Sequence, residues 1–232
     1  MDQDILSRHA APLARVYRGG LVESVHAGHV AVADRDGNVL YAAGDPGVVT
    51  FTRSALKPLQ ALPFVGAGGD THFGFSGEQV ALLCASHSGE PRQVAAVADM
   101  LARCGARADE LLCGTQAPRY FELRGEYTPP PPYSPLAHNC SGKHAGMLAC
   151  CILNGWSRGD YVEYAHPLQA AIRAAVARTA GVAEHALVAG IDGCSAPNYA
   201  LPLSRLAQAY ARLATADAAA PVLARLAAAM TA

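Results

Sequence analysis

Lysine is nearly absent from this sequence. Of its 18 basic residues in 232 positions, 16 are arginine and only two, Lys57 and Lys143, are lysine. Arginine keeps its proton in proteins, whereas a lysine can lose it when its environment lowers its pKa. A lysine retained among so many arginines therefore indicates a position that arginine could not fill. Both lysines are candidate functional residues before any motif is considered.

A strong net charge and a long apolar run are also lacking. The formal net charge of −1, without a basic stripe, argues against nucleic acid or an anionic membrane as the main partner. No apolar run is long enough to span a bilayer, and the first residues lack a signal-peptide core. We therefore expect a cytoplasmic protein. Its seven cysteines, an odd number, are expected to be thiols or metal ligands rather than disulfides.

The first 50 residues are predicted to form β-structure. Residues 30–33 and 39–42 flank a turn-rich segment with an Asp-Gly step, which is typical of a β-hairpin. Ser54 is expected as the N-cap of the first helix. Further strands are predicted at residues 21–24, 48–52 and, buried, 187–191; helices at 54–63, 76–84 (opened by a capping box), 91–104, 141–153, 167–179, 203–214 and 221–230; and an irregular segment at 114–139.

Ser54 and Lys57 form a Ser-x-x-Lys pattern at the start of the first predicted helix. At this spacing the two side chains share one helix face, so the hydroxyl and the amine are expected to meet directly. A desolvated, neutral lysine can take the proton of a serine, which is otherwise a poor nucleophile. β-Lactamases and penicillin-binding proteins use this nucleophile motif, and there too a hairpin precedes it. The alternative is that Ser54 only caps the helix and Lys57 is solvated.

A second polar segment, Ala85-Ser-His-Ser-Gly-Glu90, leads into the helix at 91–104. Ser86 or Ser88 could supply a second hydroxyl. The backbone amides near Gly89 could bind an anion at the start of the helix. The alternative is a capping turn without chemistry.

Two cysteine-containing turns could hold a metal ion. Cys140 and Lys143 are spaced i, i+3, and Cys194 follows Asp192 in a glycine turn after the predicted buried strand, where both side chains are expected to face a cleft. Two cysteines with one nitrogen donor suit Zn²⁺, which prefers a tetrahedral set of sulfur and nitrogen ligands. Cys140 could instead be a nucleophile with His144 as its base, or a small apolar residue at a helix start.

Five ordered segments together resemble one family, the bacterial L-asparaginases of the inducible rhizobial type, often termed class 3. The resemblance runs from about residue 12 to 230 in unbroken order. Any one of the segments could match by chance, whereas five in order do not. The segments are Arg18-Gly-Gly-Leu-Val-Glu-Ser24 with His26 and Gly28, Arg53-Ser-Ala-Leu-Lys-Pro58, Ser86-His-Ser-Gly-Glu90, Cys140-Ser-Gly-Lys-His-Ala-Gly146 and Asp192-Gly-Cys-Ser-Ala-Pro197.

The resemblance implies an α+β fold like that of serine β-lactamases, penicillin-binding proteins and glutaminases, an antiparallel sheet with a helical region. It also implies hydrolysis of asparagine to aspartate and ammonia. By position, Ser54 matches the nucleophile, Lys57 its base, and Ser86 a second serine that pairs with a lysine further along the chain. The remaining implied residues are a zinc site of Cys140, Lys143 and Cys194, and the orienting neighbours Arg53, His144 and Asp192.

Family members are longer than this chain, and the lysine that pairs with the second serine lies in their additional part. Residues 1–232 are therefore expected to form the N-terminal two-thirds of an asparaginase domain that is incomplete at its C-terminus. Because the chain has no third lysine, Ser86 is expected to lack a lysine partner. The alternatives are an inactive, truncated homologue that binds zinc or small amides, and a glutaminase-like amidohydrolase. No Lys-Thr-Gly triad is present, which argues against β-lactam chemistry. The resemblance further implies a homodimer.

Overall fold

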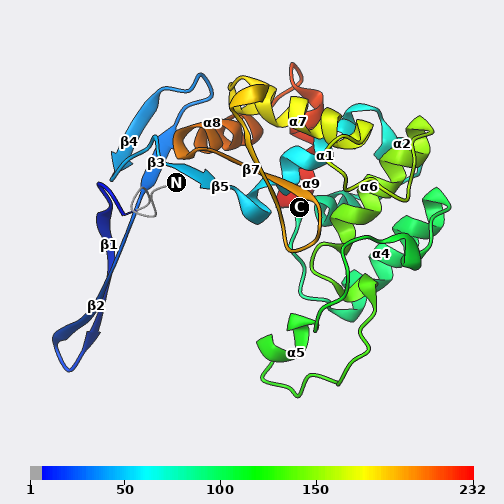
Figure 1. The fold of residues 1–232 in the computed structure, drawn as a ribbon, viewed down its shortest axis with the longest axis horizontal. Helices are drawn as coiled ribbons and strands as arrows, with labels where there is room; N and C mark the ends of the chain where they lie inside the picture. Colours follow the sequence, from blue (N-terminus) through cyan, green and yellow to red (C-terminus); the bar gives the residue numbers. More distant parts are fainter. Residues whose placement is uncertain (1–6) are drawn as a thin grey trace.

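Residues 7–232 are described by a computed structural model, in which the helices pack into a body and the strands form three small antiparallel sheets (Figure 1). The first two strands form a long hairpin that extends away from the body, the next two form a second pair, and β7 lies between β5 and β6 in the third sheet. The strands are β1 (Ala11–Arg18), β2 (Leu21–Gly28), β3 (Val30–Ala33), β4 (Val39–Ala43), β5 (Val49–Phe51), β6 (Val188–Ile191) and β7 (Pro197–Pro202).

The predicted hairpin is confirmed, since β3 and β4 pair antiparallel with Val32 opposite Tyr41. The strands predicted at 21–24 and 48–52 lie within or over β2 and β5. The expected single sheet is instead divided into three, although all of its pairings are antiparallel.

The strand predicted at residues 187–191 is present as β6, but the prediction that it is buried is wrong. β6 is an edge strand, so most of its residues are exposed. The buried central strand is β7, which was not predicted and whose first and last residues are Pro197 and Pro202. Proline cannot donate to a sheet ladder and therefore weakens the sequence signal for a strand.

Each of the seven predicted helices is present. The capping box predicted at Ser76 is confirmed, because its hydroxyl accepts from the backbone of Gln79 and the Gln79 side chain accepts from the backbone of Ser76. The helices are α1 (Lys57–Gly66), α2 (Gly69–His72), α3 (Gly77–Cys84), α4 (Pro91–Cys104), α5 (Arg119–Leu123), α6 (Ser141–Asn154), α7 (Pro167–Ala180), α8 (Leu203–Ala214) and α9 (Pro221–Thr231), with short 3₁₀ helices η2 (Arg53–Leu56), η3 (Ala108–Glu110), η4 (Pro135–Ala137) and η5 (Glu184–Ala186).

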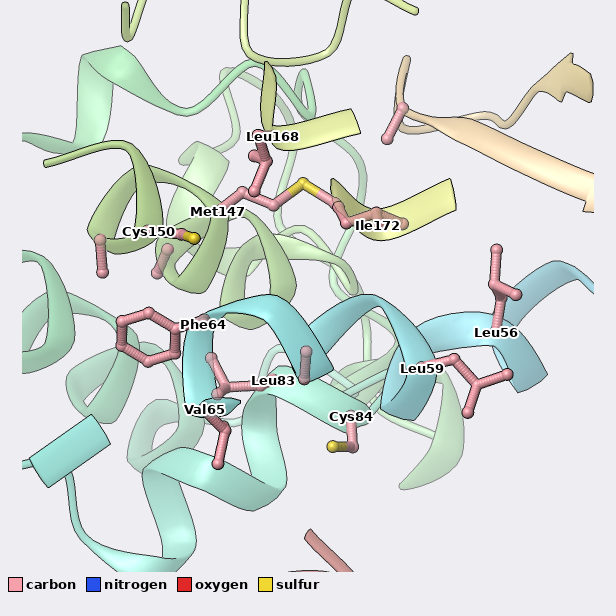
Figure 2. Packing of buried hydrophobic residues seen from close by; sticks show 14 of the residues in the cluster. Leu56, Leu59, Phe64, Val65, Leu83, Cys84, Met147, Cys150, Leu168 and Ile172 are labelled. Atoms are coloured by element: carbon pink, nitrogen blue, oxygen red, sulfur yellow. The ribbon is translucent and has the colours of Figure 1, made fainter. Parts of the chain in front are cut away.

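α1 lies at the centre of the apolar core and contacts α3, α6 and α7. Figure 2 shows Leu59 and Phe64 of this helix among Leu83 of α3, Met147 of α6 and Ile172 of α7. Burying an aliphatic or aromatic side chain of this size contributes roughly 1.5–3 kcal/mol to folding. These contacts therefore fix the helix on which Lys57 lies.

α6 approaches α3 closely because two glycines face it. A Cβ atom at Gly142 would lie 2.5 Å from the carbonyl oxygen of Leu82, and one at Gly146 would lie 2.4 Å from the side chain of Leu83. At Gly142 the neighbour is backbone, so no side chain fits there, whereas at Gly146 a side chain would have to displace a methyl group of Leu83. This contact brings the end of α3, which leads to Ser86, against the first turn of α6, which carries Lys143.

The mixed content of helices and small antiparallel sheets agrees with the expected α+β class. The finer prediction of a serine β-lactamase-like arrangement stays a prediction. No helix within residues 7–232 is both long and apolar enough to cross a membrane.

Candidate active site

Ser54 lies inside the 3₁₀ helix η2, directly before α1. The prediction that it caps the helix is wrong, because the N-cap of η2 is Thr52, and the single predicted helix at 54–63 begins instead as this 3₁₀ turn. Arg53 has a left-handed φ of 49°, which is uncommon for a residue with a side chain. The Ser54 side chain is on the surface, so its hydroxyl is accessible to a substrate.

Lys57 is only 2% exposed, so the interpretation that it is a solvated residue is wrong. Its Nζ donates to the carbonyl oxygen of Ala85 at 2.7 Å, to Ser86 Oγ at 2.7 Å and to the carbonyl oxygen of Asn139 at 3.3 Å. Burial lowers the pKa of Lys57, and the charge of Lys143 lowers it further, against an opposing effect of Cys140. An ammonium group whose pKa is lowered gives up its proton more readily than an exposed lysine does.

Ser86 connects Lys57 to Ser54. Its Oγ lies 2.7 Å from Ser54 Oγ and 2.7 Å from Lys57 Nζ, and, like Ser54, it is exposed. The three residues Ser54, Ser86 and Lys57 form what we call the serine–lysine cluster.

Two predictions are thereby corrected. Lys57 makes its hydrogen bonds to Ser86 and to two carbonyls rather than to Ser54, because its amine extends back toward the end of α3. The prediction that Ser86 lacks a lysine partner is also wrong, since Lys57 is that partner.

His87 fastens the segment that carries Ser86 to α6. Its Nδ1 accepts from the backbone N–H of Gly89 at 3.1 Å, which places the proton of the neutral ring on Nε2, 2.8 Å from Ser141 Oγ. The Ser141 hydroxyl in turn donates to the carbonyl oxygen of Leu136. Burial lowers the pKa of His87 to about 4, with Lys57 contributing, so the ring is neutral at pH 7.

The predicted anion site near Gly89 is wrong. The backbone amide of Gly89 donates to His87, and the amides of Ser88 and Glu90 donate to the side-chain oxygen of Gln93. These donors are occupied within the loop, so the alternative, a capping turn, describes the amides correctly. The segment still supplies a second hydroxyl, from Ser86 rather than Ser88, whose Oγ contacts Gln93.

The predicted metal ligands Cys140, Lys143 and Cys194 lie together and are all buried. We call them the thiol–lysine cluster. Lys143 Nζ is 3.0 Å from Cys194 Sγ. The prediction that Cys194 faces a cleft is wrong, since it is 2% exposed.

The two thiols of this cluster differ in protonation. A hydrogen bond from the Cys140 thiol lowers the pKa of Cys194, assisted by His144 and the charge of Lys143. The same hydrogen bond, together with burial, raises the pKa of Cys140. These opposite directions favour the thiolate form at Cys194 over Cys140, which argues against Cys140 as a nucleophile with His144 as its base.

His144 is fully buried and its ring is oriented by Tyr161, a residue that no sequence motif marks. The backbone N–H of Leu112 donates to the Tyr161 oxygen, so the phenol proton points to His144 Nδ1 at 2.8 Å. The neutral ring then carries its own proton on Nε2, which has no conventional hydrogen-bond partner within residues 7–232 and is an electrostatic neighbour of Cys194. Burial lowers the pKa of His144 to about 4, so the ring stays neutral.

The donor atoms of the thiol–lysine cluster are of the kinds that zinc binds. Within residues 7–232, no three His, Cys, Asp or Glu side chains gather as a metal site, so a zinc ion here would require Lys143 as a ligand. A buried thiolate, a thiol and an amine converge, which is a sulfur and nitrogen set of the kind zinc binds. Cys140, Lys143 and Cys194 therefore fit a zinc ion by the chemistry of their donor atoms.

Arg53 and Asp192 form an ion pair beside the serine–lysine cluster, with 2.9 Å between Arg53 Nη2 and Asp192 Oδ1. The guanidinium is 69% exposed, whereas the carboxylate is 14% exposed and also accepts from the backbone of Gly193. Asn198 of β7, which sequence reasoning missed, contacts both residues. No spacing rule marks this asparagine, because its partner lies 145 residues away.

These features define an α+β protein in which a buried lysine lies behind two surface serines, an arrangement suited to hydrolysis by a serine nucleophile. The chain belongs to the L-asparaginase II family, whose family model matches residues 14–232. Membership supports an amidohydrolase that acts on an amide such as asparagine. A search of curated proteins gave no match. The resemblance found in the sequence is thus confirmed at the level of an asparaginase family, and its rhizobial type stays a prediction.

Proposed function

We propose that the chain hydrolyses L-asparagine to L-aspartate and ammonia through an acyl-enzyme on Ser54. One observation carries the proposal: a continuous hydrogen-bonded chain from Ser54 Oγ to Ser86 Oγ to Lys57 Nζ, with 2.7 Å at each step. It links an accessible hydroxyl to a buried amine.

The direction of proton transfer follows from the acceptors around Lys57. The carbonyl oxygens of Ala85 and Asn139 can only accept, so a neutral amine directs its two N–H bonds to them and its lone pair to Ser86. The Ser86 hydroxyl then donates to Lys57 and accepts from Ser54. When Ser54 attacks, its proton moves to Ser86 while the Ser86 proton moves to Lys57. Ser86 is thus a relay, and Lys57 is the base.

The reaction then proceeds in two halves. In the first, Ser54 Oγ bonds to the side-chain amide carbon of asparagine, the C–N bond breaks, and the proton held by Lys57 passes to the leaving nitrogen as ammonia departs. In the second, water adds to the ester and passes a proton through Ser86 to Lys57. As the bond to Ser54 breaks, that proton returns to Ser54 Oγ, so Lys57 is neutral again and the product leaves as an acid that ionises to aspartate. The backbone N–H of Ser54 is the proposed donor to the oxyanion.

The thiol–lysine cluster is the proposed zinc site, with Cys140, Lys143 and Cys194 as ligands. Bound zinc would supply a positive charge that orients the substrate, rather than a hydroxide, because Ser54 already provides the nucleophile. Lys143 must release its proton to serve as a ligand, and Cys140 must release its thiol proton. His144, held by Tyr161, orients Cys194. The Arg53–Asp192 ion pair orients the surface beside the serine–lysine cluster.

The resemblance to the rhizobial type carries finer proposals. These are a serine β-lactamase-like fold, one asparaginase domain over residues 1–232, a homodimer and a cytoplasmic location. Sedimentation analysis tests the oligomeric state, with a monomer at micromolar concentration as the contradicting result.

The replacement Ser54→Ala tests the proposed nucleophile, with Ser204→Ala on α8 as a matched control outside the site. We expect Ser54→Ala to abolish ammonia release from L-asparagine and covalent labelling by a fluorophosphonate, while zinc content is unchanged. The control should behave as the wild type. Substantial residual turnover in Ser54→Ala, or no labelling of the wild-type chain, would contradict the proposal. Ammonia release from L-glutamine and turnover of nitrocefin, measured in parallel, separate a glutaminase-like or β-lactam-processing activity.

A further inference from the structure

The turn that carries Ser54 is held in an unfavourable backbone conformation. Arg53, directly before Ser54, has φ of 49°, in the left-handed region that residues with side chains rarely adopt. Such a conformation persists only where surrounding groups hold it, and it is concentrated at functional sites. The groups that hold Arg53 therefore determine where Ser54 points.

One buried side chain forms hydrogen bonds with both the backbone N–H and the carbonyl oxygen of Arg53. Asn198 is 3% exposed; its Oδ1 accepts from the N–H of Arg53 at 3.0 Å, and its Nδ2 donates to the carbonyl oxygen of Arg53 at 2.9 Å. The same amide accepts from the hydroxyl of Thr52 at 3.2 Å and reaches Asp192 Oδ2 at 3.5 Å. All of its hydrogen-bonding capacity is directed at this turn and its neighbours.

The sheet explains why a side chain, rather than the backbone of β7, forms the hydrogen bonds with Arg53. β5 pairs with β7 up to Phe51 opposite Ala200, and the backbone N–H of Thr52 still donates to the carbonyl oxygen of Tyr199. At Arg53 the chain leaves the ladder. Asn198 directly precedes Tyr199 in β7. Its side-chain amide takes the place of the backbone partner that Arg53 no longer has. An amide alone offers both an acceptor and donors at this position, since a carboxylate would lack the donors.

We propose that Asn198 is a positioning residue, which holds Arg53 in the left-handed conformation and thereby directs Ser54 Oγ toward Ser86. The inference rests on the proposed role of Ser54 as nucleophile. In this proposal, the orientation of the attacking hydroxyl depends on a residue of β7 that lies 144 residues further along the chain. Asn198 does not touch the reacting atoms and acts through the backbone of Arg53.

The test is a double-mutant cycle between Asn198→Asp and Arg53→Gly, read out as the second-order rate of Ser54 labelling by a small fluorophosphonate. Asn198→Asp keeps the acceptor and removes both donors. We expect at least a tenfold slower labelling rate in the folded fraction. Because glycine adopts positive φ without strain, Asn198→Asp should slow labelling less than threefold when introduced into Arg53→Gly. That non-additivity distinguishes positioning through Arg53 from a general loss of structure, which glycine would not relieve.

Thr52→Val is the milder second variant. It removes the hydroxyl that donates to Asn198 Oδ1 at 3.2 Å and to the carbonyl oxygen of Tyr199 at 3.0 Å, without altering Arg53, and we expect labelling to slow severalfold. Asn154→Asp is the matched control, since that amide caps α6 through the carbonyl oxygen of Cys150, away from the serines. It should label at the wild-type rate.

The outcomes separate the two proposals. An unchanged labelling rate in the folded fraction of Asn198→Asp overturns the inference, as does an unchanged rate in Thr52→Val if Asn198→Asp does not fold. An equal slowing in both Arg53 backgrounds also overturns it. Labelling that persists in Ser54→Ala instead overturns the proposed function, whatever the Asn198 variants do.

Discussion

The two lysines of this chain are almost equally buried, yet the hydrogen-bond partners of their nitrogens differ. Lys57 is 2% exposed and its nitrogen contacts three oxygens, while Lys143 is 5% exposed and its nitrogen contacts the sulfur of Cys194. The clusters are neighbours, because the carbonyl oxygen of Asn139 accepts from Lys57 and the following residue is Cys140. Burial alone therefore does not determine what a lysine does.

This difference shows that the atoms in contact with each lysine nitrogen determine the role of that lysine. Two carbonyls that only accept leave a neutral Lys57 with one free lone pair directed at a hydroxyl, which is the geometry of a base. Around Cys194, the hydrogen bond from Cys140 lowers the pKa of the thiol, with His144 and the charge of Lys143 contributing, and a thiolate is the form that binds a metal. We therefore expect replacements in the serine–lysine cluster to affect the reactivity of Ser54, and replacements in the thiol–lysine cluster to affect zinc.

Lys57→Met provides the largest expected contrast. Loss of the base should slow fluorophosphonate labelling of Ser54 and ammonia release by about 10³-fold, within the range that general bases contribute, while zinc content is retained. Lys143→Met is the control, and should lower zinc content while slowing labelling less than about tenfold. If the two lysine variants lost reactivity equally, the division between the clusters would be wrong.

Ser86→Ala should have the next largest effect. It removes the relay between Lys57 and Ser54, so we expect labelling to slow by roughly 10²-fold without a change in zinc content. Ser88→Ala, two residues away with its hydroxyl on Gln93, should label normally. A wild-type rate in Ser86→Ala would mean that the proton of Ser54 leaves by another path.

Cys194→Ser tests the other cluster. Replacing the thiolate should weaken zinc binding at least about tenfold, measured by competition with a chromophoric chelator, because a hydroxyl is a far poorer zinc ligand than a thiolate. Cys104→Ser is a matched buried control at the end of α4, where the thiol donates to a carbonyl oxygen. Equal zinc affinity in wild type and Cys194→Ser would exclude this cluster as the site.

The smallest expected effect concerns acid stability through His87. Its pKa is lowered to about 4 by burial, with Lys57 and His138 contributing, whereas in the unfolded chain it takes up a proton near pH 6.5. The stability that it contributes is complete above pH 6.5 and is lost as the pH falls from 6.5 toward 4, because only the unfolded state gains the proton in that window.

We expect the wild type to lose roughly 1–2 kcal/mol more of its unfolding free energy between pH 7 and pH 5 than His87→Gln loses, as measured by urea denaturation. His72→Gln, at an exposed position, serves as the control. Parallel pH profiles in the wild type and His87→Gln would show that the ring is protonated in the folded state.

Local patterns predicted much of the fold. Apolar spacing and capping residues located the helices within a few residues, since both signals depend only on neighbours in sequence. β7 and the exposure of β6 could not be predicted, because the order of strands in a sheet is a long-range property. The irregular segment at 114–139 was recognised, although it contains α5 and η4.

The candidate site divides in the same way. The scarcity of lysine singled out Lys57 and Lys143 before any motif, and motifs supplied Ser54 and Ser86. The pairing of Lys57 with Ser86 could not be predicted, since it depends on how closely the glycines of α6 let α3 approach. Asn198 and Tyr161 left no sequence signal, because each acts on a residue that is near only in the folded chain.

The burial of both lysines also makes them reporters of motion. Reagents that acylate amines, such as N-hydroxysuccinimide esters, cannot reach either nitrogen while the core is closed, and guanidinium groups do not react with them. Acylation of Lys57 therefore counts the events in which the end of α3 separates from α1, and acylation of Lys143 counts those in which the start of α6 separates from the turn at Cys194. A chain with so few amines thus carries, at the two positions that matter most, its own probes of local opening.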